Sequence, residues 1–600
     1  MGPKEVLKIQ ARAERIYKKY SHTLQPRIYA VNNFVDIFPT EKKIKIVGTY
    51  LLHNLNKNCV DTIILNLSES AHIENKKIIF SKNNHVILSD DTMGFYQFKL
   101  SKPLLPGDSM KLDFEYTIAY HGFDNDNANR SLVDNGSFIN SSFFPSIGYQ
   151  PNNEISDVDD RKKYGLPKRP RSHSIYDTAQ YNNNYISNDA DFIDFETTVS
   201  TAGDQLAIAP GYLIKQWKQN GRNYFHYKMD SKIVNFYSYL SARYEVLRDT
   251  WIDPQQKQEP VKIEIYYHKG HEYNLQVMVK SIKKSLDYFT ENFGPYQHKQ
   301  ARIIEFPRYA TFAQSFPNTI PYSEAIGFIL KLDDEKAIDM VYYVTSHEIA
   351  HQWWAHQVLG CNVDGMTTFS ESMAQYSALM VMEKEYGKAY MKRFLKYELS
   401  NYLRSRGGEK EKEQPLLFNQ NQQYLHYRKG SVVMYALQDY IGEDNMNAGM
   451  KKFISDYKFH GAPYPTAIDF YRYIQAATPD SLRSFVDDLF KRITLYSNAC
   501  TEATMSETPD KKYKVKITVN AQKFYADSIG NEHKVAMNDW VEIGALDADD
   551  KLIYSKKVKL TDKASDFEFV ISQKPFKAGV DPMNKLIDRD TDDNVKKLDN

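Results

Sequence analysis

The sequence predicts a multidomain α+β protein, with a β-sheet domain at each end and a helical domain between them. Its 600 residues are too many for a single hydrophobic core. Alternating apolar and polar residues, which are typical of half-buried strands, dominate up to residue 248 and return after residue 500. Between these limits the apolar residues follow helical spacing. We therefore predict a linker helix at 1–20, an N-terminal β-sandwich domain at 21–248, an α-rich domain at 249–500 and a C-terminal β-sandwich at 501–600.

Individual segments carry these patterns. The clearest strand patterns lie at 43–46, 111–118, 261–268, 514–519 and 566–572. Helical patterns lie at 272–292, 337–359, 368–386, 429–440 and 467–477. Thr466 is a suitable N-cap for the last of these, and Pro479 is placed to start a further helix. The stretch from Pro151 to Asp191 is polar and aperiodic, which predicts a long excursion loop.

Composition excludes several classes of protein. Apolar residues make up 42% of the chain and charged residues 26%, as in an ordinary globular protein. The formal net charge is +1, so nothing in the global balance indicates nucleic acid as a partner. The one dense basic run, Arg161 to Arg171, is broken by a glycine and two prolines. We interpret it as a solvated loop.

The cysteines and the N-terminus bear on location. The three cysteines are far apart, which indicates neither a disulfide framework nor a thiolate metal site and fits a reducing compartment without excluding the periplasm. The sequence contains no apolar stretch long enough to span a membrane, and its start, Met1-Gly2-Pro3-Lys4, lacks the apolar region of a signal peptide. We expect a soluble domain that is a piece of a longer protein.

The segment Ser346-His-Glu-Ile-Ala-His-Gln-Trp-Trp354 carries the chemistry. Residues four apart share one face of a helix, so His347 and His351 can present two imidazoles to one metal ion. Glu348 projects beside them and can reach a metal-bound water without binding the metal. Zinc lowers the pKa of such a water to about 7, and a carboxylate can then take its proton. An HExxH pattern of this kind arises rarely by chance, so the segment predicts a catalytic zinc site.

A third ligand must come from another segment. Glu371 lies in the first turn of the next helical pattern and can face back toward the histidines. Asp364, in the intervening turn, is the second candidate, while Glu383 and Glu385 lie more than two turns further along. Glu371 could also be a solvated carboxylate that the helix dipole favours.

The segment from His347 through Ser370-Glu-Ser-Met-Ala-Gln-Tyr-Ser377 resembles the aminopeptidase N family of zinc metallopeptidases, the gluzincins. That family places its glutamate ligand after a gap of eighteen residues. Nineteen residues separate His351 from Glu371 here, so Ser370 occupies the usual position. The segment resembles in particular a bacterial branch in which the peptidase follows an ABC-type transporter permease in one polypeptide.

Further matches to the family concern catalysis and substrate binding. Tyr427 precedes a Lys-Gly pair by one residue, as does the family's tyrosine that hydrogen-bonds the oxyanion. Glu324 lies 23 residues before His347, where the family's Gly-x-Met-Glu-Asn motif binds the substrate amine, although only the glutamate is retained. Gln150, just before a proline in the β-domain, corresponds to a second amine contact.

The resemblance implies an N-terminal saddle-shaped β-domain, a thermolysin-like catalytic domain and a C-terminal β-sandwich. It implies a zinc-dependent aminopeptidase acting on peptides with a free N-terminus, in a parent protein of the bacterial inner membrane with an upstream permease part. Three alternatives stay open: a thermolysin-type endopeptidase, an epoxide hydrolase, and a catalytically silent peptide-binding or sensory module attached to a transporter. The sequence does not indicate the preferred N-terminal residue, the oligomeric state or the membrane side.

Overall fold

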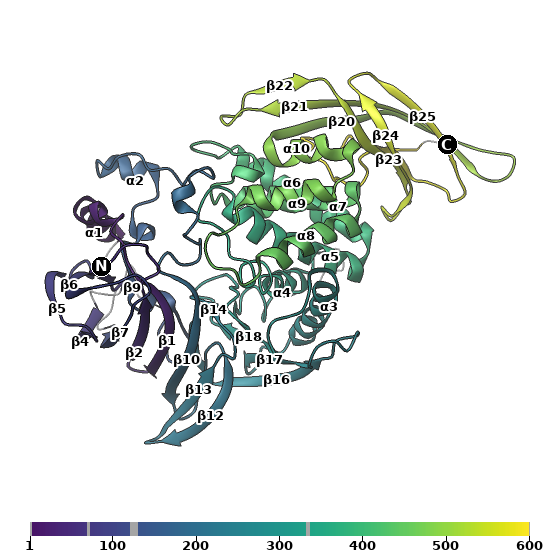
Figure 1. Ribbon diagram of the computed structural model, residues 1–600. Coiled ribbons are helices and arrows are strands. Elements are labelled where there is room, and N and C mark those ends of the chain that lie inside the picture. Colours follow the sequence, from purple (N-terminus) through teal and green to yellow (C-terminus); the bar gives the residue numbers. More distant parts are fainter. Residues whose placement is uncertain (1–2, 69–71, 121–129, 332–336, 599–600) are drawn as a thin grey trace.

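Three regions follow one another along the chain in the computed structural model, which describes residues 3–68, 72–120, 130–331 and 337–598 (Figure 1). The purple N-terminal strands and the yellow C-terminal strands lie on opposite sides of a teal and green helical region. This is the predicted multidomain α+β architecture. Within the described residues, no helix combines the length and the apolar character needed to cross a bilayer.

The N-terminal region is built from stacked sheets. The large sheet has the order β12-β13-β10-β1-β2-β7-β4, with β14 (Ile233–Val234) also on β10, and a second sheet has the order β5-β6-β3-β9. Alternate residues of both sheets form one apolar core. The large sheet consists of β1 (Arg27–Phe38), β2 (Lys43–His53), β4 (Ile73–Phe80), β7 (Ser109–Ala119), β10 (Ala190–Ala202), β12 (Tyr212–Gln219) and β13 (Arg222–Lys228). The second consists of β3 (Val60–Asn66), β5 (Asn84–Asp90), β6 (Phe95–Leu104) and β9 (Ser146–Ile147). A small sheet of β8 (Ser137–Asn140), β11 (Leu206–Ile208) and β15 (Ser238–Ala242) adjoins them.

The middle region packs helices against a four-stranded sheet. Its strands are β16 (Tyr244–Trp251), β17 (Val261–His268), β18 (Gln300–Phe306) and β19 (Thr319–Ser323). The last three run parallel to one another, and all seven residues of β18 are buried. The helices are α3 (Leu275–Phe293), α4 (Met340–Ala350), α5 (Met373–Tyr386), α6 (Lys388–Arg406), α7 (Gly430–Ile441), α8 (Glu443–Tyr457), α9 (Ala467–Ala477) and α10 (Arg483–Lys491). Thr466 caps α9 with a capping box, as expected, whereas Pro479 precedes a short 3-10 turn.

The C-terminal region contains two four-stranded sheets. One comprises β20 (Ile493–Glu507), β21 (Tyr513–Ala526), β22 (Glu532–Val535) and β25 (Ser565–Ile571). The other comprises β23 (Asn538–Leu546), β24 (Leu552–Thr561), β26 (Lys577–Val580) and β27 (Val595–Lys597). The expected boundaries at 248 and 500 fall inside strands, because β16 already belongs to the middle sheet and β20 to the C-terminal one.

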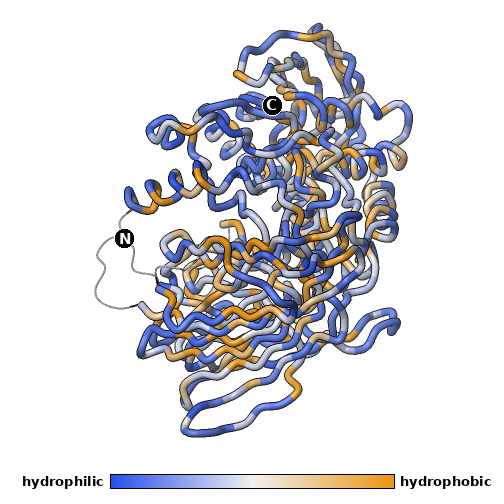
Figure 2. Tube along the Cα trace, turned by 60° about the vertical axis from the view of Figure 1, so that its left-hand side comes forward, coloured by the Kyte–Doolittle hydropathy of each residue, from blue (hydrophilic) through white to orange (hydrophobic). Residues whose placement is uncertain are grey.

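The N-terminal helix α1 (Pro3–Tyr17) packs on the β-domain, although the sequence suggested a free linker. This helix carries both hydrophobic and hydrophilic residues (Figure 2). Tyr17 stacks on Phe95 with ring centroids 4.1 Å apart. Glu14, with its side chain 2% exposed, accepts two hydrogen bonds of 2.7 and 2.9 Å from Arg161. The helix is therefore part of the fold.

The basic run is only partly the solvated loop that the sequence predicted, since its lysines are exposed but its arginines are engaged elsewhere in the fold. Arg161 is buried against Glu14, while Arg169 and Arg171 form ion pairs with acidic residues elsewhere. Most of the 151–191 segment is irregular, apart from the short helix α2 (Val158–Lys163). These contacts could not be predicted from local patterns. The partners of Arg161 and Arg171 are 147 and 238 residues away along the chain.

We expect Glu14→Ala to lower stability, because it leaves the buried Arg161 guanidinium without its carboxylate. Removing one partner of a buried ion pair costs about 3–5 kcal/mol. The thermal midpoint of the Glu14→Ala protein should therefore fall by several degrees. Glu5→Ala, on the exposed face of the same helix, is the control and should leave the midpoint unchanged. If the thermal midpoint stayed unchanged in both variants, α1 would be a linker that does not stabilise the β-domain.

Candidate active site

The two histidines of the HExxH segment lie at the end of α4. The Asp339 side chain starts this helix by accepting a hydrogen bond of 2.9 Å from the Tyr342 N–H. The helix ends at Ala350, nine residues earlier than expected, with His351 as its C-cap. His347 and His351 are still one turn apart, and their ring centroids lie 4.6 Å from each other. Both imidazoles therefore point to the same side.

Glu371 reaches the histidines from a π-helical turn, η6 (Thr368–Ser372), which leads into α5. A π-turn accommodates one residue more than the α-helical turn it replaces. This accounts for the nineteen-residue spacing, because the additional residue is absorbed where the ligand lies. Glu371, rather than Ser370, then faces His347 and His351.

The three side chains form a nearly equilateral triangle. Glu371 Oε2 lies 3.4 Å from His347 Nε2 and 3.3 Å from His351 Nε2, and the two nitrogens are 3.0 Å apart. Ligands about 2.1 Å from a tetrahedral zinc are about 3.4 Å from one another. Among the described residues, Glu371 Oε2 is buried and accepts no hydrogen bond of good geometry. The donor set therefore fits zinc.

Neighbouring groups hold His351 and Glu371 in the forms that bind a metal. His351 Nδ1 lies 3.0 Å from the Trp354 carbonyl oxygen, an arrangement that leaves Nε2 free to bind. Burial alone would raise the pKa of Glu371, but the imidazoles of His351 and His347 hold it well below its ordinary value. The carboxylate is thus ionised, as a metal ligand must be.

We expect Glu371→Ala to remove the metal, because two imidazoles alone make an incomplete zinc site. Elemental analysis of the purified protein should show about one zinc per chain, and a small fraction of that in the variant. Asp364→Ala is the control, since the Asp364 carboxylate accepts hydrogen bonds from Ser172 and Gln420 instead of facing the histidines. Zinc loss in Asp364→Ala with retention in Glu371→Ala would reverse the ligand assignment.

Glu348 lies beside the histidines with only 6% of its surface exposed. Burial raises the pKa of its carboxyl to about 7. The buried phenol of Tyr322, on β19, is close enough that the Glu348 charge contributes to its raised pKa. A carboxyl whose pKa lies near neutrality can both accept and release a proton.

Tyr427 stands on a second π-helical turn, η8 (Tyr424–Lys429), with its ring centroid 6.0 Å from that of His347. Burial raises the pKa of its phenol above 10, and the charges of Glu371 and Glu348 raise it further. The phenol therefore keeps its proton. The neighbouring Arg428 donates hydrogen bonds of 2.8 and 3.1 Å to the buried Glu398 carboxylate, which fixes the turn.

The two π-turns touch at a glycine. A Cβ atom on Gly430 would lie 2.4 Å from Ser372 Oγ, too close for any other residue at this position. Ser372 Oγ also donates a hydrogen bond of 2.8 Å to the His426 carbonyl oxygen. The Lys-Gly pair noted in the sequence thus permits the close approach of the segments that carry Glu371 and Tyr427.

The two residues expected to bind an amine differ in their surroundings. Glu324 follows β19 immediately, with its side chain 14% exposed and 3.7 Å from the Arg308 Nε atom. The Gln150 amide donates to the carbonyl oxygens of Ile147 and Gly148 in its own loop. Within the described residues, the hydrogen bonds of the Gln150 amide and the ion pair of Glu324 thus involve different partners.

Two residues near the site were missed by sequence reasoning. The Tyr185 phenol interacts with Ser370 and Glu371, and burial raises its pKa. It comes from the aperiodic 151–191 segment, which carried no signal. His426 is buried beside Tyr427, with ring centroids 4.4 Å apart. Its position next to a tyrosine already singled out could have drawn attention to it.

The segment that carries this site matches a known protein family. Residues 273–489 match the Peptidase family M1 domain. The middle region of the chain therefore carries a Peptidase family M1 domain. The matched segment contains His347, His351, Glu371 and Tyr427, together with Glu348.

Similar proteins agree with this placement. The chain is 23% identical over 361 residues to a probable aminopeptidase 2 of Sulfurisphaera tokodaii, covering 55% of this chain and 43% of the relative. It is 23% identical to a leucyl aminopeptidase of Saccharolobus solfataricus, covering 45% and 34% of the two chains. The chain thus spans less than half the length of the curated relatives it matches.

Solved structures show the same fold. Legionella pneumophila aminopeptidase A, in complex with aspartic acid, superposes with a TM-score of 0.57 at 14% identity, over 94% of this chain and 60% of that one. An M1 zinc metallopeptidase from Deinococcus radiodurans superposes with a TM-score of 0.52 at 14% identity. The superposition covers 78% of this chain and 94% of that one. At this identity the likeness establishes the architecture.

Proposed function

We propose that this protein is a zinc-dependent aminopeptidase, which removes N-terminal residues from peptides. The observation that carries the proposal is the triangle of His347, His351 and Glu371 with its orphaned carboxylate oxygen, beside the buried Glu348. The names of the relatives support the same activity, and one related structure, from Deinococcus radiodurans, is bound to a Tyr-Ser-Ala substrate.

In the proposed reaction His347, His351 and Glu371 hold the metal. Bound zinc supplies a Lewis acid that polarises the peptide carbonyl and acidifies a water molecule. Glu348 accepts a proton from the attacking water at its carboxylate and passes it to the leaving amine nitrogen. Its pKa of about 7 suits both transfers near neutral pH.

Tyr427 is proposed to donate a hydrogen bond to the oxygen that becomes negative during attack. We expect Tyr427→Phe to lower kcat by roughly 10²- to 10³-fold with little change in KM, the usual effect of losing one such donor. Steady-state kinetics on one aminoacyl substrate measures both. Tyr424→Phe is the matched control, because its hydroxyl on the same turn donates to Glu409 instead. A rise in KM alone for Tyr427→Phe would make it a binding residue.

Glu324 and Gln150 are proposed to receive the substrate's ammonium group. A buried ammonium needs a carboxylate and further acceptors. Glu324 supplies the charge, and the Gln150 side-chain oxygen a neutral acceptor. A neutral acceptor contributes less than a charge to binding an ammonium group, so Gln150→Ala should have the smaller effect.

A screen of aminoacyl fluorogenic substrates tests the proposed activity. The zinc-loaded protein should release the fluorophore, a chelator should stop the reaction, and added zinc should restore it. A protein that cuts none of these substrates, yet cleaves internal bonds, would be an endopeptidase. A protein that binds zinc and cleaves neither kind would be a catalytically silent binding module.

The proposed tether to an upstream membrane permease is a separate matter. An antibody against this chain, applied to cells that produce the protein naturally, should detect a membrane-bound polypeptide longer than 600 residues. Detection of a 600-residue protein alone would contradict the tether and leave the proposed activity untouched.

A further inference from the structure

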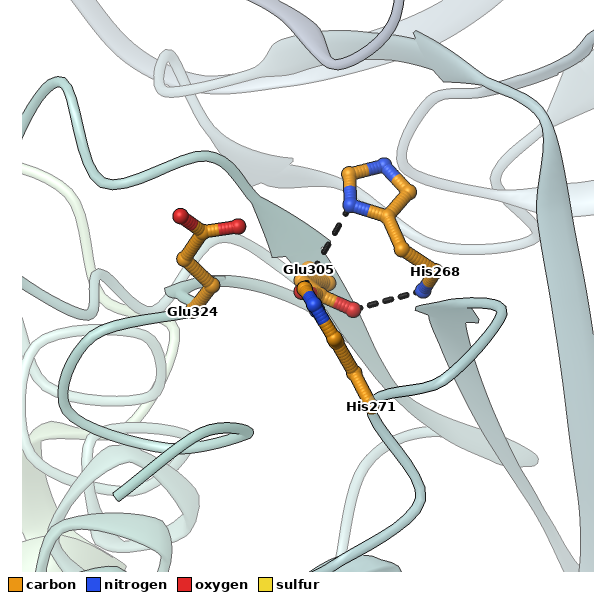
Figure 3. A group of neighbouring side chains, drawn as sticks. All are labelled: His268, His271, Glu305 and Glu324. Carbon is orange, nitrogen blue, oxygen red and sulfur yellow. Dashed lines mark hydrogen bonds and ion pairs between the residues drawn. The ribbon is translucent and has the colours of Figure 1, made fainter.

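A second cluster of metal-binding side chains lies outside the HExxH site. His268, His271, Glu305 and Glu324 each offer one ligand atom, and these atoms all lie within 4.8 Å of one another. Figure 3 shows both imidazoles approaching the Glu305 carboxylate, with Glu324 across from His268 in this view. Two imidazoles with a carboxylate are also the donor set of the first site.

Sheet topology brings these four residues together. Strands β17, β18 and β19 are parallel neighbours, so their carboxyl ends meet at one edge of the sheet. His268 is the last residue of β17, Glu305 the penultimate residue of β18, and Glu324 follows β19 directly. His271 lies three residues beyond β17. The cluster therefore rests on the buried frame of the domain.

The Glu305 carboxylate is fixed in direction. Its Oε2 accepts a hydrogen bond of 2.6 Å from the His268 backbone N–H. Its Oε1 faces the Nδ1 atoms of both histidines, in contact with that of His271 and 3.5 Å from that of His268. The His268 ring in turn stacks on the Tyr244 ring, with the ring centroids 5.5 Å apart and an angle of 6° between the ring planes. Such outer contacts orient the ligands of protein metal sites.

The charges in the cluster are those of a cation site. Glu305 is 0% exposed, so its ionised form needs a positive partner. Glu324 adds a second carboxylate. It pairs only loosely with Arg308, whose Nε atom is 3.7 Å away and whose side chain is 71% exposed. Two carboxylates and two neutral imidazoles would be balanced by one divalent ion. Imidazole donors favour zinc and similar transition metals over magnesium or calcium.

From this arrangement we infer that His268, His271 and Glu305, with Glu324, form a second binding site for zinc. Glu324 is then shared between this metal and the peptide's ammonium group. That consequence, unlike the metal site itself, rests on the proposed function. Zinc beyond the first equivalent should inhibit the enzyme, by taking the carboxylate that the substrate amine requires.

Calorimetry with zinc chloride tests the inference directly. Protein carrying one zinc per chain is titrated with further zinc, and a second equivalent should bind. Losing an outer contact of a metal site weakens binding by about 10- to 100-fold, so losing a ligand in His268→Ala or His271→Ala should weaken it more than 100-fold. His533→Ala, at an exposed position of the C-terminal region, is the control and should bind the second zinc normally.

A further variant separates this inference from the proposed function. His351→Ala should lose the first equivalent and keep the second, whether or not the protein is a peptidase. Zinc inhibition, measured as a rise in KM at excess zinc, should disappear in His271→Ala. If the titration ends at one equivalent, or if both histidine variants still bind a second zinc, the cluster is an ion pair of histidine and Glu305 and the inference is wrong.

Discussion

Glu348→Gln should keep its zinc and lose turnover by roughly 10⁴-fold, the upper end of what general acid–base catalysis contributes. The amide has the shape of the carboxyl but cannot accept a proton from water or pass one to the leaving amine. Zinc should stay, because the proposed metal ligands are His347, His351 and Glu371. Elemental analysis and steady-state kinetics on the same preparation measure both results.

Glu385→Gln provides the control for this variant. Glu385 lies on α5 and forms its ion pair with Lys280, away from the histidines. Its replacement should leave both zinc content and kcat unchanged. If Glu348→Gln kept a substantial share of its activity, the proton would travel through another group and the proposed role of Glu348 would be wrong.

Glu324→Ala should lower kcat/KM for aminoacyl substrates by about 30- to 4,000-fold. This corresponds to the 2–5 kcal/mol that the loss of one partner of a buried charge pair usually costs. The physical reason is that the substrate's ammonium would enter the site without a counter-charge. Steady-state kinetics with free and N-acetylated versions of one peptide measures the effect.

The control for Glu324→Ala is Glu264→Ala. Glu264, on β17, pairs with the exposed Arg248 and should contribute nothing to amine binding. The Glu324 variant should also discriminate less between the free and acetylated peptides than the parent does. Equal losses on both peptides would show that Glu324 supports the fold of the site rather than the amine.

The order of regions and the candidate metal-binding segment could be predicted from the sequence because both depend on local patterns. The strand at 261–268 and the helix at 467–477 agree with β17 and α9 residue for residue. The helix carrying His347 ends earlier than expected because apolar residues continue to 359 after the chain has left the helix. Apolar spacing alone cannot distinguish a buried turn from a buried helix.

Long-range contacts could not be predicted in the same way. The docking of α1 depends on Glu14 meeting Arg161, which is 147 residues further along the chain. The second histidine cluster depends on three strand ends that become neighbours only in the folded sheet. Glu371 faces the histidines despite its unusual spacing, because a π-turn can absorb one added residue without turning the side chain away.

The proposed zinc site should act on the first peptide bond of a chain with a free N-terminus. The most direct measurement compares a free peptide with its N-acetylated form and identifies the products by mass spectrometry. We predict stepwise loss of single residues from the free peptide, abolished by a chelator, and almost no cleavage of the acetylated one. Cleavage of both peptides at similar rates, at internal bonds, would contradict the aminopeptidase activity and indicate an endopeptidase.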